Sequence, residues 1–301
     1  MSRPDIWRPA GQFSRHLRKY HRRTSPPRSY ARIVSPRPPA VAGAFYPRDP
    51  RTLAAEVREC LGPPAPRRAA FGAVVPHAGY VYSGAVAGAV YARLEPVATV
   101  VLLGPNHTGL GPSASIDDHD RWSTPLGDVM IDEALAARFL RECPHLEREG
   151  MAHLREHSLE VQLPFLQEWA PGARIVPICI GAPSLALCHE IGEACAEAVA
   201  ESGSPILLLA SSDMNHYESR AVGDAKNAFA LAAIERIDPD GLFAAVVQHE
   251  ISMCGFLPTT ALLVAARRRG VSRGEIVARA DSGDRTGDTD SVVGYAGILV
   301  G

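Results

Sequence analysis

Short runs of apolar residues, separated by longer mixed segments, dominate the hydrophobic pattern from about residue 41 onward. Runs that are apolar throughout, without alternation, are typical of strands covered on both faces of a sheet. Four apolar runs have the length of buried strands: 71–76, 97–103, 174–180 and 205–210. Two further strands are predicted near 275–281 and 291–299.

Helical patterns fill the segments between these strands. An amphipathic helix is predicted over 49–60, and a helix of small residues is predicted from Ser83, as its cap, to about Arg93. A long helix is expected over 183–200, and helices are expected through most of 221–269. Strands that alternate with helices predict a single α/β domain, with a mostly parallel or mixed central sheet and helices on both faces.

Three of the predicted strands end directly in polar residues. His77 follows the first apolar run, His107 follows the second, and Asp213 and His216 follow the fourth. In an open α/β sheet, ligands bind beyond the carboxyl ends of the strands. Because these polar residues share that position, the sequence predicts a functional site at one edge of the sheet.

The residue types at this edge suggest a metal site. Neutral imidazoles such as His77 and His107 are good ligands for first-row metals. A third ligand is needed, and both Asp213 and Cys254 are candidates. Cys254 lies in a turn before a predicted helix, where a thiol can ionise; the alternative is a buried cysteine that acts as a small apolar residue.

Asp213 and His216 lie three residues apart in a polar turn. This spacing suits a general acid/base pair, or a pair in which one residue orients a ligand. The alternative is that Asp213 caps a helix and that His216 is solvated.

The stretch from His153 to His157 reads H-x-x-E-H, the pattern of the inverted zinc proteases. Such an enzyme needs both histidines on one helical turn. Pro164 lacks a backbone N–H and would disturb a helix running straight on from the motif. A helix that begins near His157 is the better prediction, and it leaves His153 outside. The sequence therefore disfavours a zinc protease.

Charge is unevenly distributed along the 301 residues, although the net charge is only −2. Residues 1–37 carry ten Arg or Lys residues and a single acid, Asp5. The near-neutral total argues against nucleic acid as a partner of the core domain. We expect residues 1–40 to form a disordered basic tail rich in Pro and Arg, and residues 41–301 to form the folded domain.

Targeting and membrane signals are not evident in the sequence. The N-terminus has no apolar segment of a secretory signal, and no stretch reaches the roughly 18 apolar residues of a membrane-spanning helix. None of the six cysteines forms a C-x-x-C pair, so a structural zinc site is not expected. Reduced thiols in a cytoplasmic protein are the expectation.

Taken together, these motifs resemble the Memo-like family, also called protein B of the AmmeMemoRadiSam system. Each motif is weak alone, but their number and order make the match specific, and it covers residues 41–301. The matching stretches are Ala44–Pro47, Pro76–Gly84, Leu103–His107, Thr124–Gly127, Glu156–Phe165, Ser211–His216, Met253–Gly255 and Ser282–Asp284.

The resemblance implies a fold similar to the class III extradiol dioxygenases, with a metal site at the edge of the sheet. It implies that His77, His107 and Cys254 bind the metal, with iron or copper as the ion. It also implies that Asp213 and His216 line the same site. His157 is placed near it, and both His157 and Glu160 are expected to belong to this site. The ring-cleaving relatives use two histidines and a carboxylate. The softer thiolate of this chain therefore argues against cleavage of a catechol ring.

Three functions fit these expectations. The first is a mononuclear non-haem metal enzyme with a redox, dioxygenase-like activity, in which His216 moves protons, Asp213 orients it and His157 assists. The second is a non-catalytic binding or scaffold protein of the AmmeMemoRadiSam system that uses the same site. The third is handling of the metal itself as cargo. The expected partners are an unknown small molecule or peptide and the radical-SAM and AMMECR-type proteins of that system; no membrane partner is expected.

Overall fold

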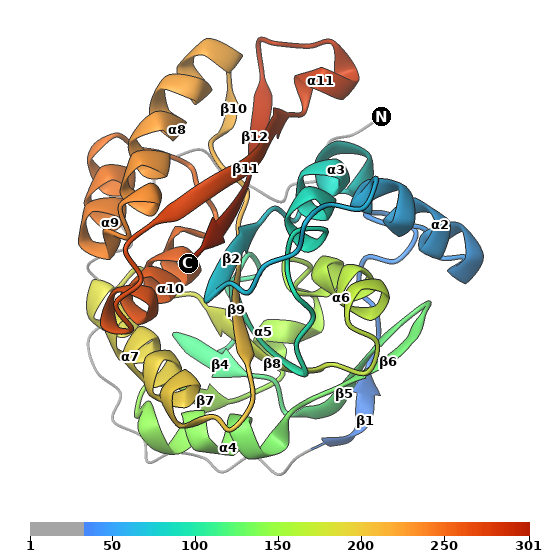
Figure 1. The fold of residues 1–301 in the computed structure, drawn as a ribbon, viewed down its shortest axis with the longest axis vertical. Coiled ribbons are helices and arrows are strands. Elements are labelled where there is room, and N and C mark those ends of the chain that lie inside the picture. The colour runs from blue at the N-terminus through green and yellow to red at the C-terminus, as the bar shows by residue number, and fades with distance from the viewer. Residues whose placement is uncertain (1–32) are drawn as a thin grey trace.

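A mixed β-sheet runs through the centre of the molecule, as the alternation of strands and helices predicts (Figure 1). The structure is a computed structural model and describes residues 33–301. Eight strands follow one another across the sheet in the order β10-β12-β2-β9-β3-β8-β4-β7, and β11 pairs with β12. Their bounds are β2 Gly72–Val75, β3 Thr99–Pro105, β4 Ala114–Ile116, β7 Glu147–Arg148, β8 Arg174–Ile180, β9 Ile206–Ser211, β10 His216–Glu218, β11 Gly274–Asp281 and β12 Val292–Val300.

The centre of the sheet consists of the four apolar runs. Strands β2, β9, β3 and β8 are neighbours and run parallel to one another. All residues of β2 and β9 are buried, because helices cover both faces there. The continuous apolar runs therefore predicted this part of the fold correctly. Strands β10, β11 and β12 add antiparallel pairs at one side, which makes the sheet mixed.

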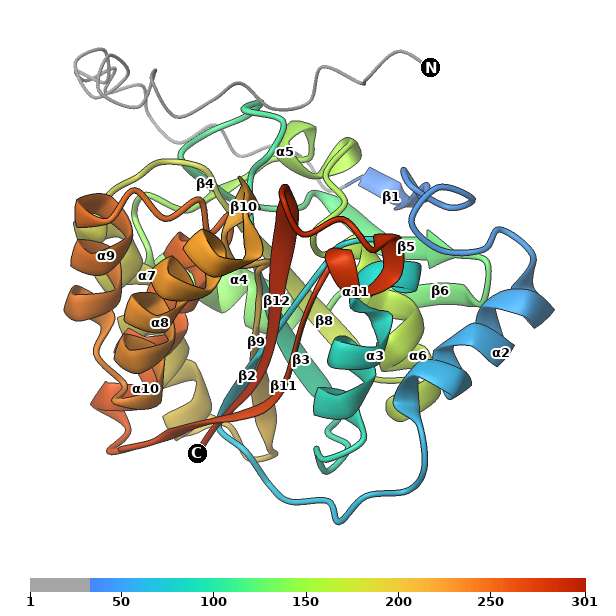
Figure 2. The same ribbon diagram turned by 90° about the horizontal axis from the view of Figure 1, so that it is seen from above.

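Helices cover both faces of the sheet (Figure 2). One layer contains α7, α8, α9 and α10, and α10 packs on β2, β3 and β9. The other contains α2, α3 and α6, and α3 packs on β2 and β12. The helices span α2 Pro50–Leu61, α3 Tyr80–Tyr91, α4 Glu133–Glu142, α5 Met151–Leu154, α6 Leu163–Trp169, α7 Leu185–Glu201, α8 Arg220–Glu235, α9 Pro239–Gln248, α10 Phe256–Arg268 and α11 Gly283–Thr286, with a short 3-10 helix, η2, at Glu160–Gln162. The predicted single α/β domain with helices on both faces is thus confirmed.

Two local predictions need correction. Helix α3 begins at Tyr80 after Gly79, so Ser83 does not cap it; the Ser83 hydroxyl donates to the Ala78 carbonyl at 3.0 Å. The region 114–148 also contains four short strands and helix α4 that the sequence pattern did not predict. Their polar and partly exposed residues do not produce the continuous apolar runs of the central strands.

A second, three-stranded sheet joins β1 (Ile33–Arg37) to β5 (His119–Thr124) and β6 (Gly127–Met130). Strand β1 runs parallel to β5, with Arg37 opposite Trp122. The fold therefore includes residues 33–37, which were expected to belong to the tail. The Pro and Arg content of this segment suggested a linker, whereas its pairing with a strand more than eighty residues away orders it. Residues 1–32 of the predicted tail lie outside the described residues.

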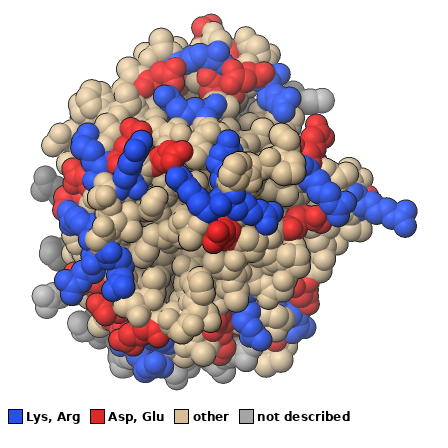
Figure 3. Space-filling view, in the orientation of Figure 1, with Lys and Arg blue, Asp and Glu red and all other residues tan. Residues whose placement is uncertain are grey.

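Surface charge on the face seen in Figure 3 is mixed, with basic and acidic side chains interspersed. Exposed ion pairs of the molecule include Arg279 with Asp224 and Arg267 with Asp240. Within residues 33–301, no helix has the length and apolar character needed to cross a membrane.

Arg37 and Glu160 form a buried ion pair that fastens β1 to the rest of the domain. Both side chains are fully buried, and Arg37 Nη1 lies 2.7 Å from Glu160 Oε2. Glu160 also accepts hydrogen bonds from the backbone N–H groups of Ala40 and Val41 and from the Tyr46 hydroxyl. Every oxygen of this carboxylate is therefore engaged in the interior. Removing the arginine would leave the carboxylate buried without its counter-charge.

We expect Arg37→Met to lower the free energy of unfolding by about 3–5 kcal/mol, because it breaks a buried pair and leaves one partner charged. The matched control is Arg58→Met, which breaks an exposed pair with Glu168 and should cost less than about 1 kcal/mol. Urea unfolding of the full chain measures both values. Equal destabilisation by the two substitutions would contradict this role for Arg37.

Candidate metal site

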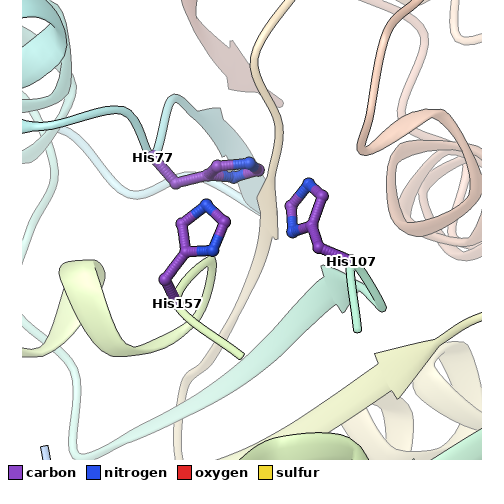
Figure 4. Close-up of side chains that lie close together, drawn as sticks. All are labelled: His77, His107 and His157. Atoms are coloured by element: carbon purple, nitrogen blue, oxygen red, sulfur yellow. The ribbon is translucent and has the colours of Figure 1, made fainter. Parts of the chain in front are cut away.

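Three histidines converge at the carboxyl edge of the sheet. His77 follows β2, His107 follows β3, and His157 lies between α5 and η2. Figure 4 shows the three imidazoles pointing toward one another. Their ring centroids are 5.3 Å apart for His77 and His107, 5.4 Å for His77 and His157, and 4.6 Å for His107 and His157. One nitrogen of each ring lies within 4.8 Å of the other two, which is close enough for one metal ion.

Cys254 joins this cluster from the turn before α10. Its Sγ lies 3.2 Å from His77 Nε2 and accepts the backbone N–H of Asp213 at 3.3 Å. The following residue is Gly255, and a Cβ there would overlap with the Ser211 carbonyl oxygen at the end of β9. A glycine is therefore needed for this turn to lie against the strand end and bring the thiol to the histidines.

The hydrogen-bond network fixes the tautomer of His77. The Ser211 hydroxyl has one proton and donates it to the Ser158 carbonyl at 2.7 Å. His77 Nδ1, 3.0 Å from the same hydroxyl oxygen, must therefore be the donor in that contact. Nε2 is then the unprotonated nitrogen, and it faces Cys254. Burial lowers the pKa of His77 well below its usual value, so the ring is neutral.

Glu156 fixes the tautomer of His107 in the same way. This fully buried carboxylate accepts the His107 backbone N–H at 2.6 Å and lies 2.8 Å from His107 Nδ1. Burial alone would raise the pKa of Glu156, but its hydrogen bond and charge interaction with His107 lower it, so the carboxylate is ionised. Nδ1 must donate to it. The nitrogen left to accept a proton or a metal is again Nε2.

The protonation of His107 also depends on its neighbours. Burial would lower its pKa, but hydrogen bonds with Cys254 and Glu156 outweigh burial and hold the pKa well above the usual value. Burial in turn raises the pKa of the Cys254 thiol. In the metal-free state, a proton therefore remains in the cluster. A metal ion bound there would have to displace it.

Asp213 and His216 lie beside the histidine cluster, as the sequence predicted. Asp213 Oδ1 accepts the backbone N–H of His77 at 2.8 Å, which holds the turn that carries this imidazole. The His216 ring places Nδ1 2.9 Å from the Ser252 carbonyl oxygen, which can only accept. Nδ1 therefore carries the proton. Burial raises the pKa of Asp213 and lowers that of His216.

His157 differs from the other two histidines of the cluster. Its ring stacks on His107 at an interplanar angle of 20° and contacts Phe45 at 4.7 Å between centroids. Its Nδ1 is 3.6 Å from Glu156 Oε1, which is beyond a hydrogen bond. Burial lowers its pKa to about 3. His157 is thus a neutral imidazole whose ring is held by stacking.

The carboxylate next to the cluster is not the one expected. Glu160 pairs with Arg37 at the anchor of β1, and its role is structural. Glu156, the glutamate of the H-x-x-E-H pattern, contacts His107 instead. The other histidine of that pattern, His153, is fully buried in α5 with Nε2 near Ser115. The two histidines therefore do not share a helical turn, as predicted. The predicted helix start near His157 is wrong, however, because His153 lies in α5 and His157 lies between α5 and η2.

Sequence reasoning missed three residues that orient the cluster: Glu156, Ser211 and Ser252. Glu156 carried a signal, because it is the acidic residue of a histidine-containing motif. The motif was weighed only as a protease pattern, in which this glutamate is the base. Ser211 and Ser252 are ordinary polar residues at a strand end and in a turn. Only their contacts with His77 and His216 reveal their role.

The donor set fits a transition-metal ion. Imidazole and thiolate ligands suit iron, copper and zinc. With metal–nitrogen and metal–sulfur bonds of about 2.0 and 2.3 Å, two ligands are separated by about 3.0 Å at a right angle and about 3.5 Å at a tetrahedral angle. The 3.2 Å between His77 Nε2 and Cys254 Sγ falls within this range.

Comparisons with known proteins point to one family. The sequence profile of the Memo-like proteins matches residues 37–299. A MEMO1 family protein of Methanosarcina acetivorans is 42% identical over 266 residues, which cover 88% of this chain and 98% of that protein. Those of Methanopyrus kandleri and Methanocaldococcus jannaschii are each 40% identical, over 87% of this chain and 98% of each relative.

Among solved structures, an uncharacterized protein from Escherichia coli K12 is similar at 16% sequence identity and a TM-score of 0.46. The match covers 69% of this chain and 87% of that chain. The family assignment rests on the sequence relatives.

The low pKa of His157 predicts a pH dependence of the metal-free protein. Because the folded pKa is about 3 and the usual value is 6.5, the stability is present above pH 6.5 and is lost as the pH falls from 6.5 toward 3. At pH 5, this one group lowers the free energy of unfolding by about 2 kcal/mol. His157→Gln should therefore lose about 2 kcal/mol less free energy of unfolding than wild type between pH 7 and pH 5. Urea unfolding at pH 7 and pH 5 measures it, and identical losses in wild type and variant would contradict the assignment.

Proposed function

This chain belongs to the Memo-like protein family, and we propose that it binds one iron or copper ion through His77, His107 and Cys254. We further propose that the ion serves a redox reaction of the dioxygenase-like type on a small-molecule or peptide substrate. The observation that carries the proposal is the orientation of two neighbouring histidines, His77 and His107, whose Nδ1 atoms each contact an oxygen and whose Nε2 atoms are left for a metal.

Orientation of this kind is typical of metal ligands. A histidine that binds a metal usually donates its other ring N–H to a carboxylate, a carbonyl or another oxygen, which fixes the tautomer. Glu156 provides this contact for His107, and Ser211 provides it for His77. Two such rings beside the Cys254 thiol supply three donors. An imidazole packed only as a core residue would not need both of these constraints.

We assign His157 a role other than that of a ligand. In the described residues no hydrogen bond orients its ring, in contrast to His77 and His107. Its neutral imidazole lies beside His77 and His107 and is available to hold a substrate group. A bound iron or copper ion would supply electrons or Lewis acidity at the centre of the cluster.

Proton handling falls to His216. With Nδ1 donating to the Ser252 carbonyl, Nε2 is the nitrogen that accepts a proton. Burial lowers the pKa of His216, so it is an acceptor near neutral pH. Asp213 acts differently, because it holds the His77 backbone at 2.8 Å. We therefore propose His216 as the general base and Asp213 as a positioning residue that also contributes negative charge.

The expectations about partners and location stay predictions. These are the radical-SAM and AMMECR-type proteins of the AmmeMemoRadiSam system and a cytoplasmic location. They follow from the resemblance and from the cysteine content, and they add nothing to the argument for the metal.

Elemental analysis of the full chain, purified anaerobically without a chelating tag, tests metal binding. We expect close to one iron or copper ion per chain in wild type, and loss of most of it in His77→Ala and Cys254→Ser, since each substitution removes a ligand. Cys60→Ser, a cysteine on α2, is the matched control and should retain the metal. Wild type without iron or copper after anaerobic reconstitution, or undiminished metal in both variants, would refute the proposal.

Substitution of Glu156 tests the orienting carboxylate. Glu156→Gln keeps the size but removes the charge that fixes the His107 tautomer, so metal affinity should fall about 10- to 100-fold. Competition with a chelator of known affinity measures this change. Glu168→Gln, on α6 and paired with exposed Arg58, is the control and should bind metal like wild type. An unchanged affinity in Glu156→Gln would show that His107 does not depend on this contact.

A further inference from the structure

A second group of metal-binding residues lies apart from the histidine cluster, at the turn between β4 and β5. It comprises Asp117, Asp118 and His119, and the ligand atoms of all three lie within 4.8 Å of one another. We propose that this group binds one divalent cation of borderline hardness, such as Mn²⁺ or Zn²⁺. The proposal is independent of the function assigned to the histidine cluster.

The spacing of the ligand atoms fits a small divalent ion. His119 Nδ1 lies 2.9 Å from Asp117 Oδ1 and 3.5 Å from Asp118 Oδ1. For metal–ligand bonds of about 2.1 Å, two ligands are about 3.0 Å apart at a right angle and about 3.4 Å apart at a tetrahedral angle. Both distances therefore match neighbouring positions around one ion.

One carboxylate oxygen of this group has no hydrogen-bond partner. Asp118 Oδ1 is buried and accepts no hydrogen bond, and the residue as a whole is only 9% exposed. A buried acceptor without a partner costs free energy and calls for an explanation such as a missing ion. Oδ1 of neighbouring Asp120 also has no hydrogen-bond partner, but Oδ2 of Asp120 pairs with Arg121 at 2.7 Å. Oδ1 of Asp118 lies 3.5 Å from His119 Nδ1 and faces the other members of the group, which points to a cation between them.

The surroundings of the group hold its members in place. Trp122 Nε1 donates to Asp117 Oδ2, which fixes the carboxylate and leaves Oδ1 for the proposed ion. Gly150, which precedes α5, packs against the carboxylates of Asp117 and Asp118. A Cβ at position 150 would overlap with Asp118 Oδ1, although a φ of −89° and a ψ of −18° suit any residue. The absence of a side chain at 150 therefore reflects the space available next to the carboxylates.

The donor types distinguish this group from the histidine cluster. Two carboxylates and one imidazole favour manganese or zinc, whereas the thiolate of Cys254 favours softer ions. The side chains of His119 and Asp118 are 11% and 12% exposed, so an ion can reach them from solvent. A bound cation would also neutralise the two acidic side chains, which otherwise repel each other at close range.

A cation here would stabilise the β4–β5 turn itself, because its three ligands are consecutive residues. Gly150, at the start of α5, packs against Asp118. Arg37 links strand β5 to α5, because its Nε donates to the His153 carbonyl at 2.8 Å and its guanidinium lies 4.1 Å from the centre of the Trp122 ring. The role of the proposed ion is therefore structural.

Titration of the full chain with Mn²⁺ tests the site. We expect wild type to bind about one Mn²⁺ ion per chain, seen as loss of the free Mn²⁺ signal in electron paramagnetic resonance, with a rise in Tm. Zn²⁺ should displace the bound Mn²⁺. Asp118→Asn and His119→Gln each remove a ligand, and each should weaken Mn²⁺ binding at least about tenfold. Asp128→Asn is the matched control, because Asp128 is an exposed carboxylate of the same small sheet.

The alternative to a metal site is an ion pair within the group. A group without an ion would instead hold a protonated His119 between the two carboxylates. Asp118→Asn would then bind Mn²⁺ as wild type does, or wild type would bind neither Mn²⁺ nor Zn²⁺ stoichiometrically, and either result overturns the proposal. Circular dichroism confirms that the variants are folded. Cys254→Ser, which alters only the histidine cluster, should bind Mn²⁺ like wild type, so failure of one site is distinguishable from failure of the other.

Discussion

The contact between the buried carboxylate of Glu156 and His107 is the interaction on which the candidate site depends. It combines a backbone and a side-chain hydrogen bond to one residue, which fixes both the position and the tautomer of the imidazole. Glu156 is itself held from two sides: Ser158 donates its N–H to the carboxylate, and Arg37 donates to the backbone carbonyl. Arg37 of β1 therefore supports Glu156, which in turn orients His107.

The sheet brings the ends of neighbouring strands together, and the connecting segments carry the side chains of the site. Adjacent parallel strands β2, β9 and β3 bring His77, Asp213 and His107 to one edge, where backbone groups are no longer used by the ladder. Cys254 and His157 arrive from segments outside these strands, and each is held by its own local contacts. This division explains how a rigid α/β core and variable connections together form a site of several donors.

The sequence predicted the parts of the molecule that obey local rules. Strands β2, β3, β8 and β9 are apolar throughout because both faces are covered, and their polar ends located His77, His107 and Asp213. Long-range pairing was beyond such rules. Arg37 lies in a segment with the composition of a linker, yet it is buried against a residue 123 positions away. Glu156 contacts His107, which lies 49 positions away in the sequence. Glu160, in the same segment as Glu156, pairs instead with Arg37.

Metal-edge X-ray absorption of the anaerobically purified full chain identifies the metal ligands directly. We predict a sulfur scatterer at about 2.3 Å together with nitrogen ligands at about 2.0 Å. The sulfur contribution should vanish in Cys254→Ser. A coordination sphere of nitrogen and oxygen alone in wild type would rule out Cys254 as a ligand and assign the metal to His77, His107 and His157.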